Sequence, residues 1–247
     1  MDIELEANER IDDLEFKNLK IIQNKDGFCF GIDSVLLSDF AKEIKNGSKV
    51  LDLGTGTGIL SILLCAKTKL SKIIGIEIQK DMADMAKRSC IINNLQDRFE
   101  VMNENIKELK GKINKNGFDA IVMNPPYMGL NSGKTNENMK KLISRHEITA
   151  TLEDFIIASK DFLKDKGCLY IVHRPNRLVD LTYLLRKYKL EPKVLRFVHS
   201  KAESAANLVL IKAVKNGRPF LKISEPLYVY DKSGNYTNEI LKIYNKI

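Results

Sequence analysis

The sequence predicts an α/β fold, in which helices cover both faces of a doubly wound, mostly parallel sheet of seven strands. Short apolar segments alternate with segments of helical periodicity from residue 49 to residue 187, and this alternation is typical of a parallel sheet. The last two apolar segments, 194–199 and 207–214, are joined by a link too short for a crossover helix. We therefore expect these two segments to form an antiparallel hairpin at one edge of the sheet.

The individual elements follow from apolar periodicity and from turn residues. The remaining strands are expected at 49–53, 72–77, 98–102, 118–123 and 168–173, and the helices at 34–44, 57–67, 81–94, 152–163 and 176–187. The segment 129–151 is long, polar and aperiodic, which is typical of a functional or disordered loop. We expect one domain over residues 1–247, with a cap segment (1–48), a core (49–214) and a C-terminal extension (215–247).

The composition limits the classes of function. The net charge of +8 is consistent with a polyanionic partner such as RNA, although a lysine-rich face is often only solvated. None of the four cysteines lies in a CxxC pair, which favours reduced thiols and a cytoplasmic protein. The three histidines lack the spacing of metal ligands, so we expect no metal. No signal peptide is recognisable, and no apolar run approaches the ~18 residues of a membrane span.

A glycine-rich turn follows the first strand, in "KVLDLGTGTGILSILLC", and contains Gly54, Gly56 and Gly58. Glycines allow unusual backbone angles and bring the backbone close to a ligand at the sheet's carboxyl edge. Glu77 ends the second strand, where a carboxylate can accept hydrogen bonds from both ribose hydroxyls of a nucleotide-like ligand. The alternatives are a tight turn without a ligand and an ordinary surface glutamate.

With Asp52 ahead of the glycines, the pattern D-x-G-x-G-x-G resembles class I S-adenosylmethionine-dependent methyltransferases, which have a Rossmann-like fold. The resemblance implies that Asp52 orients the methionine ammonium of the cofactor, directly or through water. It also implies that Gly54 to Gly58 border the methionine and ribose. Asn105 and Ile106 align with the adenine-binding pair of the family, where an acid usually stands in place of Asn105. The resemblance implies that the Asn105 carbonyl accepts from the adenine amine and that the Ile106 backbone N–H reaches the ring.

The fourth strand ends in the tetrapeptide Asn124, Pro125, Pro126 and Tyr127. The Asn124 side-chain oxygen and the Pro125 carbonyl can accept both hydrogens of a planar amine, and Tyr127 offers a ring face for stacking. Proline stiffens this arrangement. Such a clamp would orient the amine toward a methyl donor without a strong base or use of the Tyr127 hydroxyl. The alternative is a strand-terminating turn. Adenine N6, cytosine N4, guanine N2 and glutamine-amide methyltransferases all use variants of this tetrapeptide.

Three flanking segments narrow the resemblance: "FGIDSVLL" at 30–37, "RHEITATLEDF" at 145–155 and "HRPNRL" at 173–178. Together they resemble the bacterial tRNA1(Val) adenine-37 N6-methyltransferases over nearly the whole chain. The resemblance implies that cofactor closure and RNA binding involve two sets of residues. The first is Phe30, Gly31 and Asp33 over the methionine, and the second is Arg145, Arg174 and Arg177 on RNA phosphates.

Simpler interpretations of these residues remain. Asp33 would cap a helix, the arginines would be ordinary surface charges, and His146 would pack within its loop. The expected function is methylation of adenine N6 in a tRNA with S-adenosylmethionine as cofactor. The alternatives are a methyltransferase acting on another amine of rRNA, DNA or protein glutamine, and a non-catalytic RNA-binding module. A DNA enzyme usually needs a separate target-recognition domain, for which this chain has no room.

Overall fold

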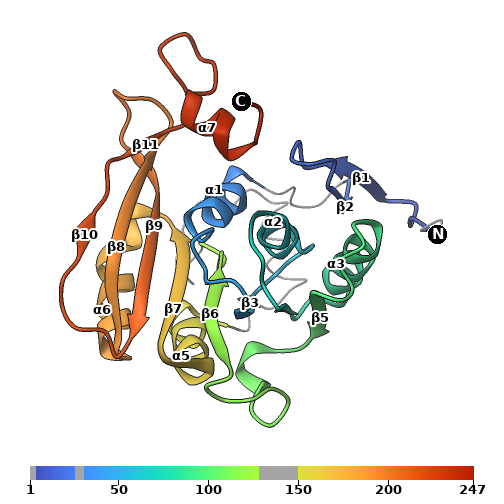
Figure 1. The fold of residues 1–247 in the computed structure, drawn as a ribbon, viewed down its shortest axis with the longest axis horizontal. Coiled ribbons are helices and arrows are strands. Elements are labelled where there is room, and N and C mark those ends of the chain that lie inside the picture. The colour runs from blue at the N-terminus through green and yellow to red at the C-terminus, as the bar shows by residue number, and fades with distance from the viewer. Residues whose placement is uncertain (1–3, 26–30, 128–149) are drawn as a thin grey trace, which may run out of the picture.

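The computed structural model describes residues 4–25, 31–127 and 150–247 and has a central sheet covered by helices on both faces (Figure 1). The sheet order is β10-β8-β9-β7-β6-β3-β4-β5, and β11 also pairs with β8. The strands are β3 (Lys49–Leu53), β4 (Lys72–Glu77), β5 (Phe99–Asn103), β6 (Phe118–Met123), β7 (Leu163–His173), β8 (Leu190–His199), β9 (Ala206–Lys215), β10 (Lys222–Ile223) and β11 (Leu227–Tyr228).

Strands β3 to β7 are mutually parallel, and β9 inserts antiparallel between β7 and β8. The seven predicted strands and the antiparallel hairpin are therefore confirmed. The sequence did not predict β10 and β11, which lie parallel to β8 at the edge of the sheet. Each has only two residues, which is too short to show a period of two in the sequence.

The helices are α1 (Ile32–Phe40), α2 (Ile59–Lys67), α3 (Lys80–Ile92), α5 (Leu152–Phe162), α6 (Leu178–Lys187) and α7 (Asn238–Ile243), with short 3₁₀ helices η1 (Ile106–Glu108) and η2 (Pro175–Arg177). Helix α1 ends earlier than expected, because Lys42 and Ile44 donate their backbone N–H groups to carbonyls three residues back. Helix α6 starts at Leu178 because η2 takes up the preceding turn, with Pro175 as its first residue.

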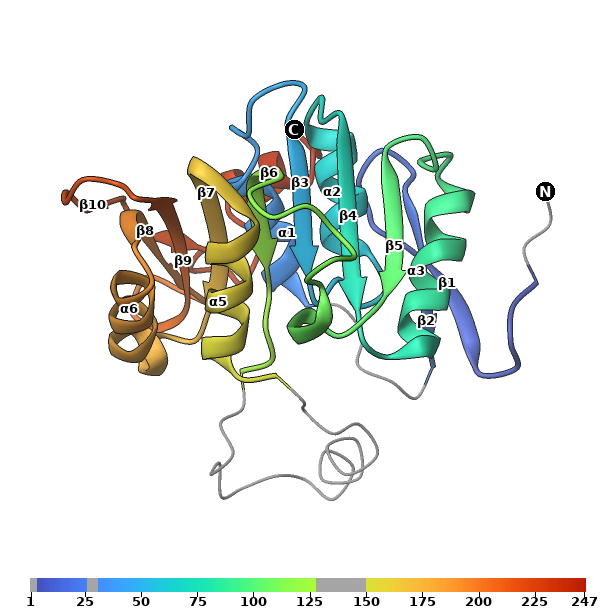
Figure 2. The same ribbon diagram turned by 90° about the horizontal axis from the view of Figure 1, so that it is seen from below.

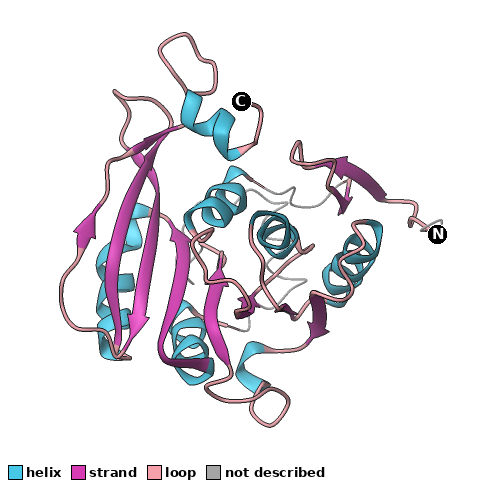
Figure 3. Cartoon of the chain, viewed as in Figure 1, coloured by secondary structure: helices cyan, strands magenta, loops and turns pink. Residues whose placement is uncertain are grey.

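Helices lie on both faces of the sheet (Figure 3). Alternate residues of the strands enter two different hydrophobic clusters, one on each face. On β6, Ala120 and Val122 join the cluster that contains buried residues of α1, α2 and α3. Ile121 and Met123 join the cluster formed with α5 and α6. This alternation fixes the register of β6 and with it the position of the tetrapeptide that follows Met123.

A separate hairpin, β1 (Glu9–Asp13) and β2 (Lys20–Asn24), packs on α3. Arg88 donates two hydrogen bonds to the Glu9 carboxylate, at 2.6 and 2.5 Å, and Ser89 Oγ accepts from the Ile22 N–H at 2.9 Å. This docking attaches the segment that leads toward α1 to the body of the domain.

The C-terminal extension returns to the same side of the molecule as α1 (Figure 1). Ile240 and Ile243 of α7 are buried in the cluster that contains α1. The rings of Tyr230, Tyr236 and Tyr244 stack in sequence, with centroid distances of 5.3 and 5.8 Å. Tyr236 and Tyr244 pack against the same cluster, whereas Tyr230 is exposed.

In the described part of the chain, no helix is long and apolar enough to cross a membrane. The same residues contain no group of three or more His, Cys, Asp or Glu side chains that could hold a metal ion. Cys65, Cys90 and Cys168 are free thiols.

Candidate active site

The sequence motifs meet at one edge of the sheet, where the parallel strands β3, β4, β6 and β7 have their carboxyl ends. Figure 2 shows the arrowheads of β3 and β4 along this edge, at the bottom of the view. Ligands of open α/β sheets bind outside the carboxyl ends of the strands, where the βα turns converge. The first turn of α1 reaches the same edge, since Asp33 contacts Tyr127 there.

The glycine turn is held by hydrogen bonds to its own neighbours. Gly54 and Thr55 donate their N–H groups to the Ile76 carbonyl at 2.9 Å, which fastens the turn to the end of β4. Asp52 Oδ2 accepts from Thr55 Oγ1 and Ser61 Oγ, both at 2.7 Å. Burial raises the pKa of Asp52 to about 6, and the two hydroxyl hydrogen bonds oppose that rise. Asp52 thus holds the turn in place from beneath.

Two glycines of this turn serve different purposes. Gly58 has φ +92°, and a Cβ there would lie 3.0 Å from the Phe99 ring, so it allows α2 to pack closely on β5. Gly56 has φ +59°, and a Cβ there would meet nothing within 4 Å. The backbone at Gly56 therefore faces open space, which leaves room for a ligand to approach.

Glu77 closes the turn from the end of β4. Its Oε2 accepts from the Gly56 N–H and its Oε1 from the Gln79 N–H, both at 2.9 Å. Burial raises the pKa of Glu77, while these backbone hydrogen bonds oppose the shift. A carboxylate has about four acceptor positions, so both oxygens can still accept from a diol.

Beyond β5, Asn105 caps η1, and its Oδ1 accepts from the Lys107 N–H at 3.0 Å. A contact from Asn105 to a cofactor amine would share this oxygen. The Ile106 side chain is buried in the hydrophobic cluster on the α5 face. The neighbouring Asn103 ties β5 to β4 by donating to the carbonyls of Glu77 and Ile78 at 2.8 and 3.0 Å.

The Asn-Pro-Pro-Tyr clamp contacts the first turn of α1. Asn124 Nδ2 donates to Ser34 Oγ at 3.2 Å. The Tyr127 hydroxyl lies 2.6 Å from Asp33 Oδ2 and 2.7 Å from Asn124 Oδ1. Burial and then the Asp33 charge raise the pKa of Tyr127, so the phenol keeps its proton. Besides the ring face that the sequence predicts for stacking, Tyr127 has a hydroxyl that joins two parts of the site.

Gly31 and Asp33 occupy the start of α1 differently from a simple helix cap. Gly31 is the N-cap residue and makes no side-chain capping bond. Asp33 lies in the first turn, and its carboxylate accepts from Tyr127. Three residues named from the sequence lie outside the described residues: Phe30, Arg145 and His146.

Arg174 and His173, at the end of β7, surround the Tyr127 ring. The Arg174 guanidinium carbon lies 4.7 Å from the ring centroid, and Arg174 Nη1 donates to the Asn207 carbonyl at 3.1 Å. His173 meets the ring edge-on at 5.3 Å, and its Nδ1 accepts from the Arg174 N–H at 2.8 Å. Burial lowers the pKa of His173 to about 4, so His173 is neutral at pH 7.

Arg177 does not join this cluster in the structure. Its Nε donates to Asp180 Oδ2 at 2.7 Å on the surface of α6. Arg174 and Arg177 were predicted to act alike, but the structure places Arg174 on an aromatic ring and Arg177 in a surface ion pair.

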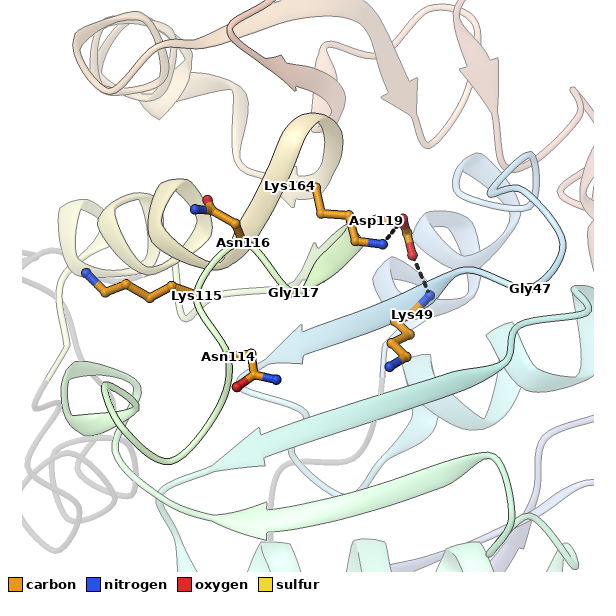
Figure 4. A pocket seen from close by; sticks show the side chains of 8 residues that line it. All are labelled: Gly47, Lys49, Asn114, Lys115, Asn116, Gly117, Asp119 and Lys164. Atoms are coloured by element: carbon orange, nitrogen blue, oxygen red, sulfur yellow. Dashed lines mark hydrogen bonds and ion pairs between the residues drawn. The ribbon is translucent and has the colours of Figure 1, made fainter.

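A polar pocket of about 600 Å³ lies at the opposite, amino edge of the sheet (Figure 4). Its lining includes Lys49 at the start of β3, Asp119 near the start of β6 and Lys164 near the start of β7. Asp119 accepts from Lys164 Nζ at 2.5 Å and from the Lys49 N–H at 2.9 Å. The pocket holds none of the motif residues, so it is separate from the candidate active site.

Comparison with known proteins agrees with this geometry. A family model described as the methyltransferase small domain matches residues 14–189. The chain belongs to this family. One curated relative is the tRNA1(Val) (adenine(37)-N6)-methyltransferase of Porphyromonas gingivalis. It is 27% identical to this chain over 242 residues, and the alignment covers 94% of this chain and 93% of the relative.

Solved structures share the fold of the methyltransferase. A predicted O-methyltransferase from Agrobacterium tumefaciens, Atu636, superimposes with a TM-score of 0.70 at 21% identity, over 86% of this chain and 95% of the other. TYW2 of M. jannaschii, solved in complex with AdoMet, superimposes with a TM-score of 0.58 at 14% identity, over 86% of this chain and 88% of the other. These neighbours confirm the predicted class I methyltransferase fold.

The sequence analysis of the methyltransferase missed residues that support its motifs. Thr55 and Ser61 hold Asp52, and Ser34 holds Asn124. A Cβ at Gly75 would lie 2.8 Å from the Thr55 side chain, so this strand glycine makes room for the turn. A glycine inside the apolar strand 72–77 was a visible signal of close approach, whereas the serines gave none.

Proposed function

We propose that this methyltransferase transfers a methyl group from S-adenosylmethionine to N6 of an adenine in tRNA, at position 37 of tRNA1(Val). The observation that carries the proposal is the clamp of Asn124 and Tyr127, which lies at the same sheet edge as the glycine turn and Glu77. The P. gingivalis relative is named for this reaction and matches almost the whole chain, which supports the choice of adenine 37.

The residues of the glycine turn fit S-adenosylmethionine. Open space at Gly56 leaves room for the cofactor beside the backbone, and the Glu77 carboxylate beside it suits a ribose diol. Asn105 and Ile106 would border the adenine, with Asn105 accepting from its amine. Since Asp52 is only 1% exposed, we propose that it supports the methionine end chiefly by fixing the turn. Gly31, at the N-cap of α1, would close the methionine side.

S-adenosylmethionine, when bound, supplies a methyl group on a sulfonium, which is already an excellent leaving group. The task of the protein is to aim an adenine amine whose lone pair is delocalised into the ring. Asn124 Oδ1 and the Pro125 carbonyl would accept the two amine hydrogens and turn the lone pair toward the methyl carbon. Arg174 covers one face of Tyr127, so the adenine would stack on the other face.

RNA recognition is the less localised part of the proposal. The net charge of +8 favours a polyanion, and the exposed Arg174 and the half-buried Arg177 flank the edge where β7 ends. An adenine in a single-stranded loop can be splayed out without breaking a duplex. We include Arg145 among the proposed RNA-binding residues on the basis of the sequence resemblance alone.

Incubation with tritiated S-adenosylmethionine and total RNA, followed by digestion, tests the proposed function. The expected product is N6-methyladenosine, and a tRNA1(Val) transcript with guanosine at position 37 should remain unlabelled. Another labelled nucleoside would overturn the choice of adenine N6. Calorimetry showing tight binding of NAD and none of S-adenosylhomocysteine would overturn the choice of cofactor.

A further inference from the structure

The Tyr127 hydroxyl has one proton and two acceptors. Asp33 Oδ2 lies 2.6 Å away and Asn124 Oδ1 lies 2.7 Å away. Carboxylate and amide carbonyl oxygens only accept hydrogen bonds, so the single phenol proton cannot be donated fully to both. The two acceptors therefore compete, and the outcome sets how much of Asn124 Oδ1 remains available to a substrate amine.

The orientation of Asn124 makes this competition matter. Its Nδ2 donates to Ser34 Oγ at 3.2 Å, which turns Oδ1 toward the Tyr127 hydroxyl. Ser34 is buried, and the following residues of α1, Val35, Leu36 and Leu37, are anchored in the hydrophobic core. The partners of the clamp are thus attached to a rigid element, and Asp33 is held beside Tyr127 by the same turn.

We propose that Asp33 is a positioning residue for methyl transfer, because by taking the Tyr127 hydrogen bond it frees Asn124 Oδ1 to accept from the substrate amine. Hydrogen bonds to a charged acceptor are stronger than those to a neutral amide. The Tyr127 hydroxyl therefore donates to the Asp33 carboxylate once the substrate amine donates to Asn124 Oδ1. Tyr127, held by Arg174 on its face and His173 at its edge, transmits the effect. The inference rests on the proposed function and deepens it.

A double-mutant cycle tests the inference by measuring kcat, KM for tRNA and the Kd of S-adenosylhomocysteine. Asp33→Asn should lower kcat roughly tenfold to a hundredfold, the range for a lost hydrogen bond to a charged group, with KM and Kd unchanged. In the Tyr127→Phe background no hydroxyl remains to compete, so Asp33→Asn should change kcat by no more than about twofold. Asp33→Glu, which keeps a carboxylate, should recover part of the rate.

Two results would overturn the inference. Equal losses of kcat from Asp33→Asn in both backgrounds would mean that Asp33 acts independently of the hydroxyl. A tenfold weaker Kd with an unchanged kcat would make Asp33 a cofactor contact instead. If Asp33→Asn does not fold, Asp33→Ser removes the same carboxylate and is judged by the same criteria.

The matched control is another tyrosine that donates to a carboxylate. Tyr188, which follows the last residue of α6, donates to Oε1 of Glu153 in the first turn of α5 at 2.6 Å. Neither residue belongs to the candidate site. Tyr188→Phe and Glu153→Gln should leave kcat unchanged. Failure of the proposed function would appear in the parent protein, as no N6-methyladenosine, whereas failure of the inference would appear only in the variants of an active parent.

Discussion

The glycine turn and the Asn-Pro-Pro-Tyr clamp lie at the same sheet edge but are held in different ways. The turn is stabilised by partners that are near in sequence: Asp52 binds side chains three and nine residues away, and Gly56 binds Glu77 across 21 residues. The clamp depends on α1, because Asn124 and Tyr127 bind side chains 90 and 94 residues away. The turn is therefore a local structure, whereas the clamp exists only once the domain has folded.

This contrast suggests a division of labour. A turn built from near neighbours can be rigid before any substrate arrives, which suits the binding of a cofactor of fixed shape. A clamp assembled from α1, β6 and β7 responds to the position of each element, so small changes far from the chemistry can alter its aim. Variants of the turn should change affinity or stability, and variants of the clamp should change rate.

The largest effect is expected at the clamp. Asn124→Ala removes an acceptor for the substrate amine, so methyl transfer should fall by roughly 10²–10³, while S-adenosylhomocysteine binding persists. Asn124→Asp keeps an acceptor oxygen and should lose less. Single-turnover transfer to tRNA and calorimetry check the two quantities, and an Asn124→Ala protein that methylates at the parent rate would refute the clamp.

A change in the turn should affect affinity rather than rate. Glu77→Ala should weaken cofactor binding by ~1–3 kcal/mol, the range for a lost hydrogen-bonded charged contact. Glu100→Ala is the control and should bind normally, because Glu100 lies on β5 in an exposed ion pair with Lys72 of β4. If calorimetry gives equal affinities for the two variants, Glu77 does not bind the cofactor.

Gly58 and Gly56 should differ in their effects, because Gly58 packs against protein atoms and Gly56 faces open space. Gly58→Ala should cost the fold ~1–3 kcal/mol, because of its φ of +92° and the Phe99 ring at 3.0 Å from the new Cβ. Gly56→Ala should destabilise less, since its Cβ meets no protein atom, but should weaken cofactor binding more. Urea unfolding and calorimetry on both variants test this; the reverse order in both measurements would contradict it.

Asp52 should make stability depend on pH. Its pKa rises from 3.8 to about 6 on folding, so the folded state binds more protons over this interval. The Asp52 contribution to the free energy of unfolding should therefore fall as pH rises from about 4 to 6 and then level off. Urea titrations should show this slope in the parent and a smaller slope in Asp52→Asn. Identical slopes would show that Asp52 does not titrate in this range.

The smallest effect is expected at the surface. Arg177 already pairs with Asp180, so Arg177→Ala should weaken RNA binding only slightly. The slope of the logarithm of RNA affinity against the logarithm of salt concentration should become shallower by about one. Arg174→Ala should in addition lower the rate of transfer, because it uncovers a face of Tyr127. Filter binding at several salt concentrations, with transfer assays, distinguishes them. An unchanged rate in Arg174→Ala would leave Arg174 as a surface charge only.

The sequence by itself determined the fold class and the two motifs. Periodicities of two and 3.6 residues reflect which face of each element is buried, so five parallel strands and the hairpin could be located to within a few residues, apart from the early start of β7 and β8. The glycines and the tetrapeptide were recognisable because local backbone geometry restricts their residue types.

Tertiary structure alone decided what holds the clamp. No local pattern links Asp33 and Ser34 to residues beyond position 120, since a hydrogen bond across 90 residues leaves no periodicity in the sequence. The same holds for Arg174, whose place over Tyr127 depends on the pairing of β6 with β7. The sequence specifies which side chains are present, but the packing of strands and helices decides which side chain each of them contacts.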